Sequence, residues 1–202
     1  GRAIIGSPPD RFRACPVPMS ASAVTAALLE VVDLECIRGD RLLFGGLAFA
    51  LGAGEIVQVE GANGAGKTSL LRILCGLARP TAGEVRWQGT DIRAQRAGYG
   101  RDVAYVGHAA GVTERLSGIE NLRYAARMAG TGAEGTGAAL ERVGLADCGE
   151  LPVRALSAGQ RRRVALACLL LLPARLWLLD EPFTALDAGG RALVERLLSE
   201  HL

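Results

Sequence analysis

The fold of this chain is decided by one stretch, Gly61-Ala62-Asn63-Gly64-Ala65-Gly66-Lys67-Thr68-Ser69. It matches G-x-x-x-x-G-K-[ST], in which glycines turn backbone N–H groups toward a nucleotide's phosphates and the lysine reaches the β- and γ-phosphates. Lys67 is the only lysine among 23 basic side chains, and all the others are arginines. Because arginine's broad planar guanidinium would not fit such a cradle, the single lysine favours a phosphate-binding P-loop over an ordinary glycine-rich turn.

The flanking residues place this loop between a strand and a helix. Residues 55–59 form an apolar run of strand length, and residues 69–74 have the composition of a buried helix. A helix N-terminus that faces the loop attracts phosphate through its free N–H groups. We therefore expect every residue from Gly61 to Ser69 to contribute to nucleotide binding.

Length and composition limit the function classes. With 202 residues, 50% of them hydrophobic, the chain is long enough for one α/β domain. A net charge of +2 provides no strong field for nucleic acid, so no nucleic-acid partner is expected. The five cysteines are odd in number and form no C-x-x-C pair, which favours reduced thiols that fill small apolar spaces. No stretch approaches the roughly 20 apolar residues of a membrane span.

The N-terminal residues 1–26 differ from the rest of the chain. They contain four prolines among Ser, Arg and Ala, and they lack the apolar segment of a signal peptide. We expect this stretch to be a disordered extension, with Met19 as a candidate start residue.

The remaining pattern predicts an α/β P-loop NTPase. Strands are expected at residues 28–34, 47–51, 55–59, 84–87, 102–106 and 176–179. Turns are expected at Gly39-Asp40 and Gly45-Gly46, and helices from about Ile119 to Leu172, interrupted between Gly130 and Gly137. This order predicts a parallel core sheet with an N-terminal antiparallel β subdomain and a helical subdomain.

A second motif, Leu156-Ser157-Ala158-Gly159-Gln160, precedes a long apolar helix. Here the sequence resembles the ATP-binding-cassette (ABC) ATPases, whose signature is L-S-G-G-Q. The resemblance implies that Ser157, Gly159 and Gln160 bind the γ-phosphate of an ATP held by a second protomer, and hence a head-to-tail homodimer. The same letters also describe a plain helix cap, serine followed three residues later by glutamine. The position of Ser157, 90 residues after Lys67, favours the signature.

A third motif, Leu176-Trp177-Leu178-Leu179-Asp180-Glu181-Pro182, matches the Walker B strand of the same family. Its two acids follow a buried strand, at the edge of the sheet where phosphates bind. We expect Asp180 and the Thr68 hydroxyl to hold Mg²⁺, and Glu181 to polarise the water that attacks the γ-phosphate. Adjacent acids at a strand end are otherwise solvated turn residues. Residues 185–187 match the family's D-loop, which crosses the dimer interface.

Two positions depart from the family pattern. His108 stands where most cassettes have a glutamine that contacts Mg²⁺ or the attacking water and senses the membrane partner. A neutral imidazole can order water in the same way, although His108 could equally shape only a loop. The adenine-stacking aromatic is also missing, and Arg38 could stack its guanidinium on the base or face solvent.

The resemblance also bears on the end of the chain. The family's switch histidine lies on a strand after the helix that begins near Gly189, and this chain ends at His201-Leu202, within that helix. We therefore expect residues 27–202 to form an ABC ATPase domain, truncated at its C-terminus, with a helical subdomain at about residues 109–160.

Within the family, softer matches indicate the cargo. The blocks Val106–Val112 and Leu116–Leu122 resemble the ATP-binding subunits of cytochrome c biogenesis haem exporters, the CcmA type. The resemblance implies an ATPase that uses ATP and Mg²⁺, binds integral membrane subunits at the cytoplasmic face of a bacterial inner membrane, and drives haem export. Three alternatives stay open: an ABC subunit for another cargo, a non-transport ABC ATPase, and a cassette that binds ATP without hydrolysing it.

Overall fold

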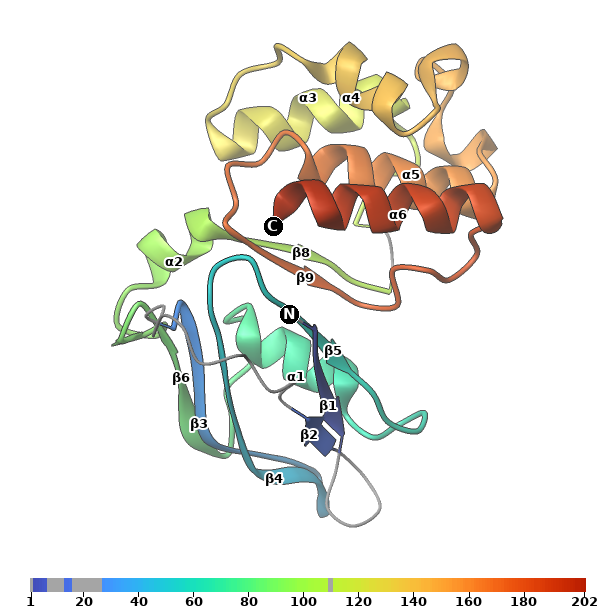
Figure 1. Cartoon of the computed structure of the whole chain (residues 1–202). Coiled ribbons are helices and arrows are strands. Elements are labelled where there is room, and N and C mark those ends of the chain that lie inside the picture. Colours follow the sequence, from blue (N-terminus) through green and yellow to red (C-terminus); the bar gives the residue numbers. More distant parts are fainter. Residues whose placement is uncertain (1, 7–12, 16–26, 109–110) are drawn as a thin grey trace. The chain divides into compact units, whose positions relative to one another are not determined.

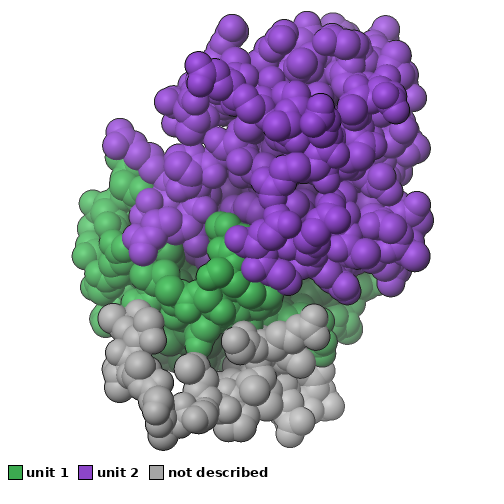
Figure 2. All heavy atoms as spheres, turned by 45° about the horizontal axis from the view of Figure 1, so that its top comes forward, with its two compact units in different colours: residues 1–100, 201–202 green, residues 101–200 purple. Residues whose placement is uncertain are grey.

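The computed structural model describes residues 2–6, 13–15, 27–108 and 111–202. The chain divides into two compact units, one of residues 1–100 with 201–202 and one of residues 101–200 (Figure 2). Each unit has its own strands and helices and is described by itself. This division tests neither the expected ATPase domain at residues 27–202 nor its helical subdomain at about residues 109–160. Both boundaries stay predictions.

The first unit contains an antiparallel sheet (Figure 1). Strands β3 (Leu29–Arg38) and β4 (Arg41–Leu51) form the predicted hairpin, and β6 (Ala82–Trp87) pairs with the other edge of β3, followed by β7 (Thr90–Asp91). Alternate side chains of β3 are buried, as expected for a strand with one face on the core.

The predicted turn at Gly45-Gly46 is wrong, since β4 runs through both residues. Leu34 pairs with Leu47 and Cys36 with Phe44, so Gly45 and Gly46 together oppose the single residue Glu35. This is a β-bulge, and Gly46 adopts the positive φ of +65° that a bulge can require. Glycine marked a bend inside a strand rather than its end.

The P-loop joins β5 (Ile56–Val59) to α1 (Lys67–Leu74), as predicted. Strand β5 pairs in parallel with β1 (Arg2–Gly6), which pairs with β2 (Arg13–Cys15). Strands β1 and β2 therefore lie within residues 1–26, the stretch that was expected to be disordered. The other residues of 1–26, Met19 among them, lie outside the described part of the chain. The short helix α2 (Arg96–Asp102) was not predicted, because its two glycines disfavour helix.

The second unit combines a parallel strand pair with helices. Strands β8 (Val103–Val106) and β9 (Leu176–Leu179) lie side by side (Figure 1). The helical elements are α3 (Gly118–Ala129), α4 (Thr136–Arg142), the 3₁₀ turns Ala146–Cys148 and Val153–Ala155, α5 (Ala158–Leu169) and α6 (Ala188–His201). The predicted interruption ends early, because Gly135, in the left-handed region, directly precedes α4.

Helix α5 is the centre of this unit. It packs against α3 and α4 and also against β8, so its buried side chains point to several sides. Val164 and Ala167 are inaccessible to solvent, and the unit's apolar core forms around them. Arg162 on this helix is buried, although charged side chains are rarely buried unless they are paired.

The described cysteine thiols are free. Burial raises the pKa of the Cys168 thiol to about 12, and burial also raises the pKa values of Cys36 and Cys75. Raised thiol pKa values suppress the reactive thiolate, and the role of the cysteines as apolar fillers stays a prediction.

Candidate functional site

The P-loop adopts a backbone path that only glycine follows easily. Gly64 and Gly66 have φ angles of +78° and +105°. Gly66 directly precedes α1, and its carbonyl accepts the first helical hydrogen bond from Leu70 N–H at 2.8 Å. The N–H groups of the first helical turn thus face the loop, which is the arrangement that binds phosphate.

Close packing is a second reason for glycine at position 66. A Cβ atom there would lie 3.0 Å from Leu43 Cβ and 3.3 Å from Phe44 Cδ1. At Gly64, by contrast, a Cβ atom would have nothing within 4 Å inside the chain. Of these two loop glycines, Gly66 is the one at which backbone conformation and packing both disfavour a side chain.

Lys67 points its ammonium back into the loop. Its Nζ donates to the carbonyls of Gly61 at 2.6 Å and Ala62 at 3.1 Å. The Ala65 N–H donates to the Ala62 carbonyl at 3.1 Å and closes the turn. A positive charge is thereby held inside the ring of loop residues, in reach of a phosphate that the loop amides bind.

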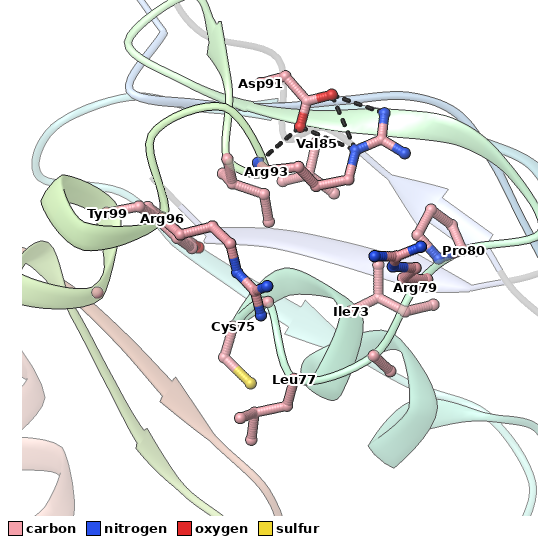
Figure 3. Close-up of a pocket in the computed structure, with 14 residues that line it drawn as sticks. Ile73, Cys75, Leu77, Arg79, Pro80, Val85, Asp91, Arg93, Arg96 and Tyr99 are labelled. Carbon is pink, nitrogen blue, oxygen red and sulfur yellow. Dashed lines mark hydrogen bonds and ion pairs between the residues drawn. The ribbon is translucent and has the colours of Figure 1, made fainter.

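A pocket of about 290 Å³ lies near the other end of α1 and is distinct from the P-loop (Figure 3). Its lining includes Cys75, Leu77, Arg79 and Arg96. The Tyr99 hydroxyl donates to the Leu74 carbonyl at 2.5 Å and fixes the helix end beside it. The pocket adjoins the C-terminal end of α1, whereas Lys67 is at the N-terminal end, so it is not the predicted phosphate site.

In the second unit, the ends of β8 and β9 bring two predicted catalytic residues together. The strands are in register, with Val106 beside Leu179, and the ladder continues as Asp180 N–H donates to the Val106 carbonyl at 2.8 Å. Beyond this bond, His108 Nδ1 lies 3.4 Å from Glu181 Oε2. The His108 side chain is 73% exposed and that of Glu181 is 45% exposed, so both can meet a ligand.

The two acids of the third motif have different surroundings. Asp180 is only 4% exposed, whereas Glu181 is exposed and has a positive φ of +50°. For a residue other than glycine this conformation costs about 1–3 kcal/mol, and such residues cluster at functional sites. The Thr184 hydroxyl donates to Glu181 Oε2 at 3.2 Å and orients the carboxylate from the following turn.

Sequence reasoning assigned no role to Arg162, one of three consecutive arginines at positions 161–163. Its Nη1 donates to the Gly107 carbonyl at 2.7 Å and its Nη2 to the Asp180 carbonyl at 2.5 Å. Burial lowers the pKa of its guanidinium, and the charges of Asp180 and Glu181 oppose that shift. The available indication was its spacing from Leu166 and Leu169, which puts it on a buried face of α5.

The second motif begins α5, with Ser157 as its N-cap. Gln160 N–H donates to Ser157 Oγ at 3.1 Å, and Ser157 N–H donates to Gln160 Oε1 at 2.9 Å. This is the capping box that the alternative interpretation named. Since Ser157 Oγ is the acceptor here, its hydroxyl proton stays available to an anion. The cap and phosphate recognition are therefore compatible.

Gly159 has a tertiary neighbour. A Cβ atom at this position would lie 3.0 Å from the carbonyl of Ala185, which has a φ of +62°. The predicted D-loop thus passes directly over the second motif. Asp187, two residues on, accepts from Gly190 N–H at 2.7 Å and from Arg163 Nη2 at 3.1 Å, and its pKa is lowered by these contacts, that of Gly190 first.

Arg38 lies at the exposed end of β3. Its neighbour Ile37 is fixed by a hydrogen bond from its N–H to Thr81 Oγ1 at 2.9 Å. The side chain of Arg38 is accessible to a ligand, and base stacking by it stays a prediction. The P-loop and Arg38 belong to the first unit, and the other predicted site residues belong to the second.

Comparison with known proteins gives one family. The family model described as ABC transporter matches residues 44–184. A protein from Methylococcus capsulatus named cytochrome c biogenesis ATP-binding export protein CcmA is 57% identical over 171 residues, 84% of this chain and 83% of the relative. A protein of the same name from Escherichia coli O157:H7 is 49% identical over 86% of this chain and 83% of the relative.

Solved structures show the same fold. An ABC transporter ATP-binding protein from Pyrococcus furiosus superposes with a TM-score of 0.75 at 28% identity, over 86% of this chain and 85% of that chain. In the described part of the chain, no helix has the length and apolar character needed to cross a membrane.

Proposed function

Because this chain belongs to the ABC transporter family, we propose that it is the ATP-binding and ATP-hydrolysing subunit of an exporter that serves cytochrome c biogenesis. One observation carries the proposal. The matched segment, residues 44–184, contains the P-loop, His108, the signature and the Asp180-Glu181 pair in the order of an ABC ATPase. The groups expected to bind phosphate and to hydrolyse ATP therefore fall within the family match.

The first unit supplies groups for the nucleotide. The amides of the P-loop and the Lys67 ammonium bind the β- and γ-phosphates, and the left-handed glycines keep those amides pointing inward. Arg38 stacks on the adenine. ATP binding follows from the family, and the assignment of individual residues is part of the proposal.

The residues also fit a magnesium ion. Mg²⁺ is usually held by one or two carboxylates together with phosphate oxygens and water, so no dense cluster of protein ligands is required. Asp180, nearly buried at the end of β9, and the Thr68 hydroxyl beside Lys67 are suitable donors. When bound, the ion neutralises charge on the β- and γ-phosphates.

Hydrolysis depends on the second unit. Glu181 orients and polarises the attacking water, and His108, 3.4 Å from it, orders that water or reports the nucleotide state to a membrane partner. Phosphoryl transfer requires positioning more than covalent chemistry, so these two side chains act by where they are held.

The working unit is a head-to-tail homodimer. In this arrangement Ser157, Gly159 and Gln160 of one protomer bind the γ-phosphate at the other protomer's P-loop. The free Ser157 proton and the N-terminus of α5 suit an anion. The dimer sits on integral membrane subunits at the cytoplasmic face of a bacterial inner membrane, and its cargo is haem.

Two variants in the complete protein test the ATPase assignment. Lys67→Ala should abolish ATP binding, measured by calorimetry. Glu181→Gln should bind ATP like the parent yet hydrolyse it about 100-fold more slowly, because the water is no longer oriented. Unchanged turnover in the Glu181→Gln protein would refute the role of Glu181.

The exporter assignment needs a separate test. Tagged protein purified from detergent-solubilised membranes should carry haem-exporter membrane subunits, identified by mass spectrometry. It should also restore c-type cytochrome assembly in a bacterium that lacks its own ATPase subunit, whereas the Glu181→Gln protein should not. Membrane subunits of another transporter would refute the cargo and leave the ATPase assignment intact.

A further inference from the structure

The separation of His108 and Glu181 depends on the two backbone segments that follow β8 and β9. Both residues lie beyond the last ladder pair, Val106 with Leu179. Past that pair, the described part of the chain shows one further backbone bond of the β8–β9 ladder, from Asp180 N–H to the Val106 carbonyl. Segments with few ladder bonds move more freely, so a further connection between these two would fix their separation.

Arg162 supplies that connection. One guanidinium nitrogen donates to the carbonyl of Gly107, the residue before His108, and the other donates to the carbonyl of Asp180, the residue before Glu181. The donor distances are 2.7 and 2.5 Å, and Arg162 is only 6% exposed. A single rigid group therefore spans the two segments immediately ahead of the two candidate catalytic side chains.

Arginine suits this task better than other residues. Its planar fork carries several donors at fixed separation, so two acceptors bound to it are fixed relative to each other. Burying a charge is costly unless it is compensated. Here the compensation comes from the two carbonyls and from the charges of Asp180 and Glu181. A residue needed only for packing on α5 would be apolar, like Leu166.

We propose that Arg162 is a positioning residue for ATP hydrolysis, which holds His108 and Glu181 at their working separation by bracing the carbonyls of Gly107 and Asp180. The inference rests on the proposed role of Glu181. It assigns to Arg162 an effect on turnover and none on ATP binding, because the P-loop residues belong to other segments of the chain.

The experiment compares three variants of the complete protein assembled with its membrane subunits. Arg162→Gln removes the fork, and Arg162→Lys keeps the charge but can hold the two carbonyls only loosely. Arg142→Gln is the matched control, since Arg142 lies in the same unit and makes an exposed ion pair with Glu200. We expect kcat to fall about 10- to 100-fold for Arg162→Gln and about 3- to 10-fold for Arg162→Lys, because small misplacements of catalytic groups are costly.

In both Arg162 variants the KM for ATP should stay within about 2-fold of the parent value, as expected when ground-state binding is intact. Arg142→Gln should leave both constants unchanged. If Arg162→Gln does not fold, Arg162→Lys alone decides the matter. An unchanged kcat, or a loss confined to KM, would overturn the proposal.

A double-mutant cycle separates positioning from general destabilisation. If Arg162 acts through Glu181, then adding Arg162→Gln or Arg162→Lys to Glu181→Gln should lower the residual turnover of radiolabelled ATP by less than about 2-fold. If an Arg162 substitution lowers turnover by the same factor with and without the Glu181→Gln change, the positioning role is overturned and the proposed function stays in place. Full turnover in Glu181→Gln alone would overturn both.

Discussion

The P-loop and the ends of β8 and β9 both present polar groups beyond a strand, but they hold them in different ways. The P-loop uses consecutive residues, Gly61 to Ser69, and its shape follows from glycine backbone angles and a lysine that bonds its own loop. The second site joins segments that are far apart in the sequence. His108 and Glu181 meet because β8 lies beside β9, and Arg162 on α5 bonds the residue before each of them.

This difference has consequences for mutation. A site made from one continuous loop should be most sensitive to changes in its backbone, since its side chains contribute little to its shape. A site braced by side chains from several elements should be sensitive to those side chains, even where they never touch the ligand. The following variants test each half of this contrast.

The largest effect is expected at Gly66. Gly66→Ala places a Cβ atom 3.0 Å from Leu43 Cβ in a residue with φ of +105°. Strain of about 1–3 kcal/mol and overpacking of similar size should lower the free energy of unfolding by about 2–5 kcal/mol and weaken ATP binding. Gly64→Ala is the control, with a left-handed φ but open space around it, and should cost about 1 kcal/mol. Equal urea midpoints for the two variants would contradict the packing argument.

A smaller effect is expected where the signature meets the D-loop. Gly159→Ala would press on the Ala185 carbonyl 3.0 Å away. Alanine favours the helix by about 1 kcal/mol, which offsets the contact, so the free energy of unfolding should change little. Displacement of the D-loop should nevertheless lower ATP turnover about 3- to 10-fold.

Gly137→Ala controls for the helix effect, because a Cβ atom at this position of α4 has nothing within 4 Å. It should stabilise the protein slightly and leave turnover at the parent level. Full turnover in the Gly159→Ala protein would show that the Ala185 carbonyl can shift without loss of activity.

The contact between His108 and Glu181 predicts that the two side chains act together on turnover. The imidazole lies 3.4 Å from Glu181 Oε2 and can order the water that Glu181 polarises. His108→Gln keeps a hydrogen-bonding group at this position and should keep activity, while His108→Ala should lower ATP turnover by about 3-fold. Equal turnover in the parent and both variants would reduce His108 to a loop residue.

The smallest effect concerns stability in acid. The Gly190 N–H and the Arg163 guanidinium lower the pKa of Asp187 from its ordinary value of 3.8. A carboxylate with a lowered pKa in the folded state stabilises above its ordinary value, and that contribution disappears as the pH falls through the lowered one. Asp187→Asn should therefore reduce stability slightly near neutral pH, and it should flatten the loss of stability below about pH 4. Thermal unfolding measured across this pH range checks both effects. An identical acid limb would show that the charge of Asp187 does not matter.

Much of the fold followed from local patterns. The strand hairpin before the P-loop, the strands β8 and β9 and the helix α5 were predicted because apolar period and length distinguish them. The errors arose where glycine has more than one meaning. Gly45-Gly46 was assigned to a turn and forms a bulge, and the glycines of α2 concealed a helix.

Chemistry written as a contiguous pattern was determined by the sequence itself: the P-loop and its single lysine, the acids after β9 and the serine that caps α5. Each depends on neighbours a few residues away, which a linear pattern records. The tertiary structure alone decided that His108 lies against Glu181, that Gly159 lies under the Ala185 carbonyl, and that Arg162 braces two strand ends. These contacts join residues brought together by parallel strand pairing and helix packing, whose geometry no local spacing contains.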